Sequence, residues 1–107
     1  MPTPPALSDD QRQAALAKAA EARRVRAALK EKLKAGEVSL AELFERAQDD
    51  PIVAGTKILT IVESMPRTGK VKARRTLAAA GVSESRRVRG VGPAQRHRLL
   101  AAFPPES

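Results

Sequence analysis

The residues around Pro66 limit what this chain can fold into more than any other stretch. The segment before them, 57–64, carries the apolar content of a helix at Ile58, Leu59, Ile61 and Val62. Pro66 cannot continue that helix, because it lacks a backbone N–H and disfavours a helical residue before it. Thr68 can then cap a second helix through its side-chain oxygen. We therefore predict a helix, a tight connection and a second helix within residues 56–80.

The second of these helices begins with basic residues and no acidic ones. Gly69 lets the backbone approach a ligand closely, and four cations follow it, at Lys70, Lys72, Arg74 and Arg75. The first N–H groups of a helix have no partner within the helix, and the helix dipole is positive at that end. Such a helix start binds anions, and the cations around it favour a phosphate.

The charge of the whole chain points the same way. Its 107 residues suit one small domain, and 20 Lys and Arg outnumber 12 Asp and Glu, for a formal charge of +8. Residues 64–107 hold ten basic and two acidic side chains, whereas residues 37–63 hold two and six. A basic surplus concentrated in the C-terminal part and the first helix is typical of nucleic-acid binding. The plainer alternative is a generally solvated basic surface.

The chain lacks the residues that several classes of protein chemistry require. The chain has no Cys, Trp or Tyr, one histidine (His97) and two phenylalanines, so we expect no metal site, no cofactor and no enzyme. Stacking platforms for single strands are missing as well. Gly69 and Lys70 lack the upstream glycine of a Walker loop. Neither a secretory signal nor an apolar run of about 20 residues is present, so we expect a cytoplasmic protein without a membrane segment.

The periodicity predicts an all-α fold, since no stretch alternates with period two. Residues 1–7 read as a disordered N-terminal tail, 8–36 as a long basic helix, 37–103 as a helical head and 104–107 as a C-terminal tail. Capping boxes begin at Ser8 and Ser39. The first half of the long helix is rich in alanine, and larger apolar residues come later, at Val25, Leu29 and Leu33. We expect the second half to pack on the core while the first half projects.

Two motifs in this order resemble a known family. They are Met65-Pro66-Arg67-Thr68-Gly69-Lys70-Val71-Lys72-Ala73 and Arg86-Arg87-Val88-Arg89-Gly90-Val91-Gly92-Pro93-Ala94-Gln95-Arg96. The chain resembles the integration host factors of mycobacteria and streptomycetes over nearly its whole length. The resemblance implies a long N-terminal helix and a head with a helix-two-turns-helix unit, which also occurs in formamidopyrimidine DNA glycosylases and a small-subunit ribosomal protein. It implies a nucleoid-associated protein that binds duplex DNA with little sequence preference and alters its shape.

The resemblance also assigns residues to the DNA contact. It implies a phosphate and minor-groove clamp at the turn, formed by Pro66, Arg67, Thr68, Gly69, Lys70 and Lys72. A basic arm follows at Arg86, Arg87 and Arg89, and the same motif continues with Gly90, Gly92 and Arg96. From the charges of the first helix we add secondary DNA contacts at Arg23, Arg24, Arg26, Lys30 and Lys34. Neighbouring helix positions point in different directions, so an ordinary solvated helix explains any single one of these as well.

These expectations describe an architectural DNA-binding protein of the nucleoid, acting as a monomer. The family name implies support of site-specific phage integration, which would follow from DNA shaping and not from contact with the integrase, and transcription regulation would follow in the same way. One alternative is an RNA-binding accessory of the ribosome. Another is a protein-interaction adaptor that uses the acidic side within residues 37–63.

Overall fold

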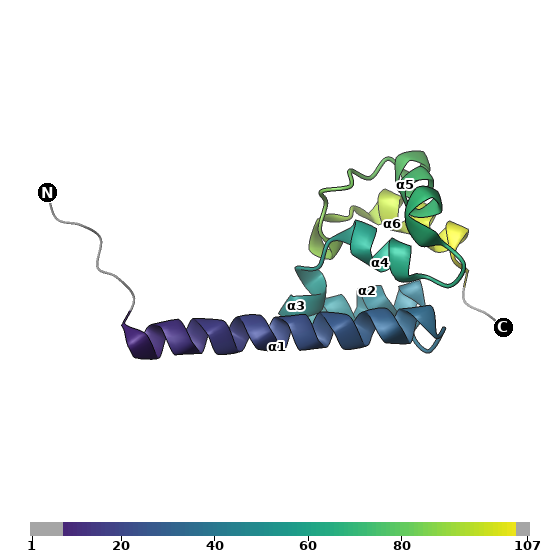
Figure 1. The fold of residues 1–107 in the computed structure, drawn as a ribbon. Helices are drawn as coiled ribbons and strands as arrows, with labels where there is room; N and C mark the ends of the chain where they lie inside the picture. The colour runs from purple at the N-terminus through teal and green to yellow at the C-terminus, as the bar shows by residue number, and fades with distance from the viewer. Residues whose placement is uncertain (1–7, 105–107) are drawn as a thin grey trace, which may run out of the picture.

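The computed structural model describes residues 8–104, and this part of the chain is all-helical, as predicted (Figure 1). The elements are α1 (Asp9–Lys34), α2 (Leu40–Asp49), α3 (Pro51–Ala54), α4 (Ile58–Ser64), α5 (Gly69–Ala80), the short 3-10 helix η1 (Val88–Gly90) and α6 (Pro93–Ala102). The expected N-terminal tail, residues 1–7, lies outside the described residues, as do residues 105–107 of the expected C-terminal tail.

The long helix α1 is packed at one end only. Ser8 Oγ accepts from Gln11 N at 3.2 Å, and Ser8 N donates to Gln11 Oε1 at 3.0 Å, so the predicted capping box is formed. The 26 residues of α1 span roughly 39 Å at 1.5 Å per residue. Leu29 and Leu33 are buried, whereas Leu16 is 62% exposed. The second half therefore packs against the head and the first half projects, as Figure 1 shows.

The head begins with two helices that are capped by side chains. Ser39 forms the second predicted capping box with Glu42, and Leu40, Leu43 and Phe44 of α2 are buried. Asp50 then caps α3, because its Oδ1 accepts from Ile52 N at 2.9 Å. Both caps are local, and the cap of α2 was predicted from the sequence.

The core draws one or more side chains from every element. Its fully buried members include Leu33 of α1, Ile61 of α4, Leu77 of α5 and Leu99 of α6. Burying one such side chain contributes about 1.5–3 kcal/mol. The core therefore fixes how α1 lies under the head, and this packing places the cations of α1 beside α3 and α4.

The connection between α4 and α5 corrects one detail of the prediction. Thr68 is the N-cap residue of α5, but its side chain makes no capping bond. Its backbone is in the right-handed helical region, at φ −96° and ψ −63°, and its Oγ1 donates to Pro66 O at 3.2 Å. A side-chain cap needs an extended backbone at this residue. The start of α5 is therefore left without the expected cap.

The segment after α5 is held against the head by backbone hydrogen bonds. Gly81 ends α5 in the left-handed conformation at φ 74°. Residues 86–88 then pair with residues 56–58, since Ile58 N donates to Arg86 O and Val88 N donates to Thr56 O, both at 2.9 Å. Gln95 at the start of α6 donates to Gly81 O at 2.7 Å.

Candidate nucleic-acid interface

The turn before α5 is an exposed, uncapped helix start. Gly69, its first residue, adopts φ 68°, and a Cβ placed there would meet no atom within 4 Å. Pro66, Arg67, Gly69, Lys70 and Lys72 are exposed, whereas Thr68 is half-buried. Side chains cap α1, α2 and α3, but none caps α5. The first N–H groups of α5 are therefore free of a side-chain acceptor and face open space, an arrangement that suits an anion.

Arg67 sits in this turn with an unusual backbone conformation. It is the non-glycine residue with positive φ, at 60°, within residues 8–104. The left-handed region costs an L-residue roughly 1–2 kcal/mol. Backbone strain of this kind is often found at functional sites, and here it directs an exposed cation outward beside the open start of α5.

The predicted basic arm lies at the other end of α4. Arg86, Arg87 and Arg89 are exposed, and Val88 between them is buried. Arg86 Nη1 donates to Gly90 O at 2.7 Å, and a Cβ on Gly90 would come within 2.9 Å of Arg86 Cδ. Gly90 is therefore needed for the close approach of the Arg86 side chain. Arg87 donates to Gly55 O, which links the arm to the C-cap residue of α3.

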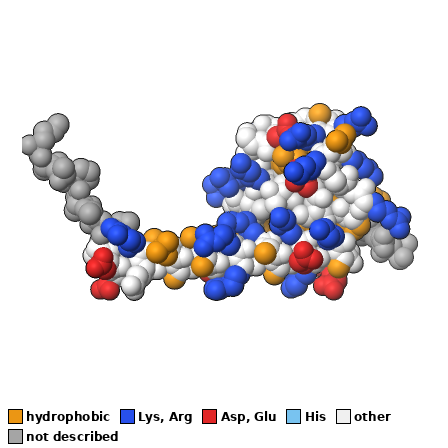
Figure 2. All heavy atoms as spheres, viewed as in Figure 1, with side chains coloured by type: hydrophobic (Ala, Val, Ile, Leu, Met, Phe, Trp, Pro, Cys, Tyr) orange, Lys and Arg blue, Asp and Glu red, His pale blue; other side chains and the backbone are white. Residues whose placement is uncertain are grey.

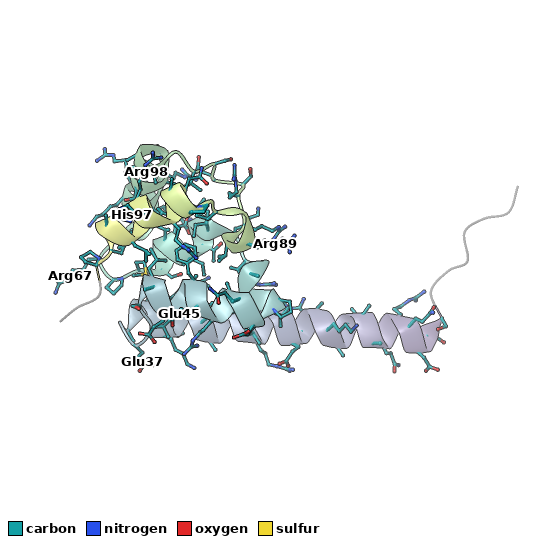
Figure 3. The ribbon with its side chains drawn as sticks, turned by 180° about the vertical axis from the view of Figure 1, so that it is seen from behind. Glu37, Glu45, Arg67, Arg89, His97 and Arg98 are labelled. Atoms are coloured by element: carbon teal, nitrogen blue, oxygen red, sulfur yellow. The ribbon has the colours of Figure 1, made fainter. Side chains whose placement is uncertain are left out.

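The structure does not bring the turn and the arm together. The turn follows the C-terminus of α4, whereas the arm pairs with residues at its N-terminus. The seven residues of α4 put roughly 10 Å between the two ends. Arg67 and Arg89 accordingly lie on opposite sides of the head in Figure 3.

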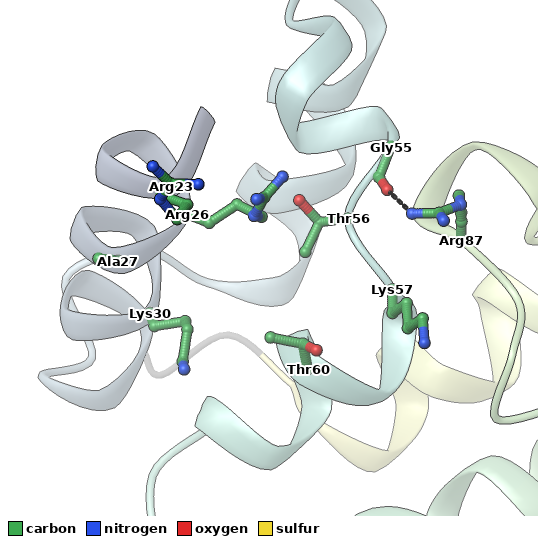
Figure 4. A pocket seen from close by; sticks show the side chains of 9 residues that line it. All are labelled: Arg23, Arg26, Ala27, Lys30, Gly55, Thr56, Lys57, Thr60 and Arg87. Carbon is green, nitrogen blue, oxygen red and sulfur yellow. Dashed lines mark hydrogen bonds between the residues drawn. The ribbon is translucent and has the colours of Figure 1, made fainter. Parts of the chain in front are cut away.

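The arm does come together with part of α1. Arg23, Arg26 and Lys30 of α1, Lys57 and Arg87 line one open cleft of about 630 Å³ (Figure 4). The spacing of Arg23, Arg26 and Lys30 places them on one face of the helix. Arg24 does not line the cleft; its Nη2 is instead 2.6 Å from Glu21 Oε2. Lys34 is exposed near the end of α1 and does not line the cleft either.

The last predicted contacts lie on a third part of the head. The Arg96 guanidinium lies over the ring of Phe44, 5.8 Å from its centroid, and lines a cavity of about 230 Å³ with Arg89. Gly92 N donates to Gln95 Oε1 at 3.0 Å, and this glycine is the N-cap residue of α6. Gly92 is half-buried, and its contact with DNA stays a prediction.

Among residues 8–104, no acidic side chain forms an ion pair with the cations of the turn, the arm or the cleft. The two ion pairs within residues 8–104 are Arg24 with Glu21 and Arg74 with Glu84. Figure 2 shows Lys and Arg side chains over the head and the adjoining half of α1. Figure 3 shows Glu45 on α2 and Glu37 just before it, at the lower edge of the head. These cations are therefore available to an anionic ligand.

Sequence reasoning missed Lys57, Thr56 and Thr60, which also line the cleft. Lys57 is one of two cations in the acidic segment 37–63, so local charge gave no reason to select it. The sequence shows that Lys57 directly precedes the apolar run of α4. It does not show that Lys57 lies close to Arg87, because this depends on the pairing of two segments that are distant in the sequence.

No three His, Asp or Glu side chains within residues 8–104 are grouped in a way that could hold a metal ion. None of the helices in this part of the chain combines the length and the apolar character needed to cross a membrane.

The chain matches known proteins over most of its length. Residues 33–103 match the family model of the S13-like H2TH domain. The chain is 42% identical to the integration host factor of Mycobacterium tuberculosis over 99 residues, covering 92% of this chain and 94% of the relative. It is 45% identical to the integration host factor of Streptomyces coelicolor, covering 92% of each. A solved structure titled as sIHF bound to an 8-base-pair palindromic DNA matches with a TM-score of 0.78 and 42% identity, covering 80% of this chain and 97% of that one.

Proposed function

The chain belongs to the integration host factor family of mycobacteria and Streptomyces, with an S13-like H2TH domain, and we propose that it is an architectural protein of duplex DNA. It binds DNA with little sequence preference and changes its shape or topology. The relative solved with an 8-base-pair palindromic DNA supports a duplex as the ligand and gives no support to the RNA alternative. No catalytic role is proposed.

One observation carries the proposal, the open start of α5. Its N–H groups have no side-chain cap, Gly69 leaves space for close approach, and Arg67, Lys70 and Lys72 surround it without an acidic partner. Backbone amides at a helix start bind a phosphate oxygen directly, and the flanking cations neutralise adjacent phosphates. We assign the primary DNA contact to this turn.

The arm supplies a second contact at the opposite end of α4. The two ends of α4 lie roughly 10 Å apart, so the turn and the arm meet different phosphates of one duplex. A duplex held at both ends of α4 has phosphates fixed on either side of a minor groove, and an arginine of the arm can enter that groove. Two fixed points on a short protein surface provide a means of bending the duplex.

The composition of the contact surfaces explains the low sequence preference. The unpaired groups are Lys and Arg, which contact phosphates in any sequence. The chain has no Asn, and Gln95, the glutamine nearest the arm in sequence, is bonded to the backbone at Gly92 and Gly81. Side chains that read adenine edges are therefore absent from the turn and the arm.

The remaining roles follow from DNA shaping. We place the protein in the cytoplasm, on the nucleoid, as a monomer. Support of phage integration would come from the shaped DNA and would need no contact with an integrase. The cations Arg23, Arg26 and Lys30 of α1 give the protein a secondary DNA contact, whereas Arg24 is engaged with Glu21.

The test is the salt dependence of binding to a random-sequence duplex of about two helical turns. For B-DNA the slope of log affinity against log salt is about −0.9 per neutralised phosphate. We expect Lys70→Gln with Lys72→Gln to weaken binding equally on every sequence and to reduce the slope by about 1.8. Lys18→Gln with Lys32→Gln removes the same charge from exposed positions on α1 and serves as the control.

The outcomes separate the alternatives. An unchanged slope in the Lys70 and Lys72 variant would move the contact away from the turn. Equal losses in both variants would show a diffuse charge effect without a specific site. Stronger binding of duplex RNA than of matched duplex DNA would favour the ribosome-associated alternative.

A further inference from the structure

The cleft between α1 and the head concentrates positive charge in one hollow. Five cationic side chains line it, Arg23, Arg26, Lys30, Lys57 and Arg87, and none of its other lining residues is acidic. Neither ion pair within residues 8–104 involves any of the five. Figure 4 shows Arg23, Arg26 and Lys30 on one wall with Thr56 and Thr60 facing them, and Lys57 and Arg87 beyond the segment that joins Gly55 to α4.

Three separate segments build this cleft, and each is held in place. Leu29 and Leu33, at 4% and 0% exposure, anchor the part of α1 that carries the cations. The hydrogen bonds of Ile58 N to Arg86 O and of Val88 N to Thr56 O fix the opposite wall. Arg87 itself donates to Gly55 O. The convergence of charge is therefore a property of the fold and not of flexible side chains alone.

Gathering like charges has a cost that an anion removes. Each cation in the cleft repels the others, and no carboxylate offsets the repulsion. Arg26 is half-buried, so its charge is less screened by water than that of an exposed residue. An anion in the cleft would turn this repulsion into attraction and would link α1 to the head.

We infer that the cleft is a binding site for a compact polyphosphate anion, either inorganic triphosphate or the triphosphate group of a nucleotide. Its volume of about 630 Å³ lies within the range of small-ligand sites. Several cations facing one space match several charges on one small ligand, and the arginine guanidinium binds phosphate oxygens in pairs. The hydroxyls of Thr56 and Thr60 lie in the same lining, although Thr56 Oγ1 already donates to Ile52 O at 2.8 Å.

The lining also indicates which part of a nucleotide is recognised. No aromatic residue lines the cleft, so it offers no stacking surface for a base. The phosphates carry the recognition, and inorganic triphosphate binds about as tightly as ATP. Duplex DNA meets these cations differently, because it presents its phosphates in rows on a convex surface.

Occupation of the cleft has two consequences. A ligand that binds only the folded protein raises its unfolding temperature, since binding draws the equilibrium toward the folded state. The second consequence rests on the proposed function: Arg87 belongs both to the cleft and to the arm, so bound triphosphate competes with DNA for that residue. The binding itself does not depend on the protein being a DNA-binding protein.

The test measures inorganic triphosphate binding to the full-length chain in the absence of DNA. Isothermal titration at constant ionic strength is compared for the parent, for Arg26→Gln with Lys30→Gln, and for the control Lys18→Gln with Lys32→Gln. The control changes the same number of charges on the same helix at positions that do not line the cleft. We expect saturable binding that weakens at least tenfold in the cleft variant, about 1.4 kcal/mol, and stays within twofold in the control.

Titrations with other anions identify which one the cleft binds. ATP, orthophosphate and sulfate are titrated at the same ionic strength, and circular dichroism establishes that each variant is folded. Similar affinities for triphosphate and ATP, well above those for orthophosphate and sulfate, support the inference. Non-saturable binding, or equal losses in the cleft variant and the control, overturns it. So does a cleft variant that loses affinity for a duplex while its triphosphate affinity is unchanged, because the cleft then serves DNA alone.

Discussion

Replacing Arg67 separates the stability of the turn from its charge. Arg67 adopts φ 60°, in the left-handed region that favours glycine. Arg67→Ala keeps a Cβ and the backbone strain, whereas Arg67→Gly relieves the strain, and both remove the cation. The left-handed conformation costs roughly 1–2 kcal/mol, and glycine forfeits roughly 0.5–1 kcal/mol in backbone entropy. We therefore expect the glycine variant to be more stable than the alanine variant by about 0.5–1 kcal/mol.

Urea unfolding followed by circular dichroism measures this difference. With a denaturant slope of about 1–3 kcal/mol per molar, the midpoint of Arg67→Gly should lie several tenths of a molar above that of Arg67→Ala. Binding should not separate the two variants, because each loses one phosphate contact and about 0.9 of the salt slope.

A matched pair of substitutions on α5 should reverse the order of stability of the glycine and alanine variants. Arg75 is exposed within the helix, where φ is negative, so Arg75→Gly should be less stable than Arg75→Ala by about 1 kcal/mol. Equal stability of the two Arg67 variants, with the normal difference at Arg75, would show that Arg67 is not in the left-handed conformation in solution. The argument from strain would then fail.

Two further pairs of substitutions test the packing of α1 and the glycines at the two ends of α5. Leu33→Ala should cost about 2–5 kcal/mol because the side chain is fully buried, whereas Leu16→Ala on the projecting half should change stability by less than about 0.5 kcal/mol; similar urea midpoints would contradict this docking. Gly69→Ala and Gly81→Ala both place a Cβ at positive φ and should each cost about 1 kcal/mol. Only Gly69→Ala should also weaken duplex binding, so an equal loss of affinity at Gly81 would argue against a contact at the turn.

The sequence predicted the elements well because their boundaries are set locally. Ser8 and Ser39 form their capping boxes with residues three positions away, and Gly81 ends α5 through its own backbone conformation. The apolar spacing of α2 likewise placed Leu43 and Phe44 in the core. Such features depend on neighbours within one helical turn, and the sequence contains them in full.

Local reasoning was wrong at Thr68 for a physical reason. The residue type suits a helix cap, but a cap also requires an extended backbone. The turn through Pro66 and the left-handed Arg67 leaves Thr68 at ψ −63°, and its hydroxyl bonds to Pro66 O instead. Residue preference alone could not reveal this, because the conformation of Thr68 follows from the path of the whole turn.

The sequence by itself determined the helices, the basic residues at the start of α5 and the excess of positive charge. Only the tertiary structure decided that the arm lies at the other end of α4 from the turn, and that it shares a cleft with Arg26 and Lys57. The reason is that α1 docks through buried Leu29 and Leu33, and residues 86–88 are fixed by backbone bonds to residues 56–58. Neither interaction involves the charges, so the charge pattern could not indicate which cations would converge.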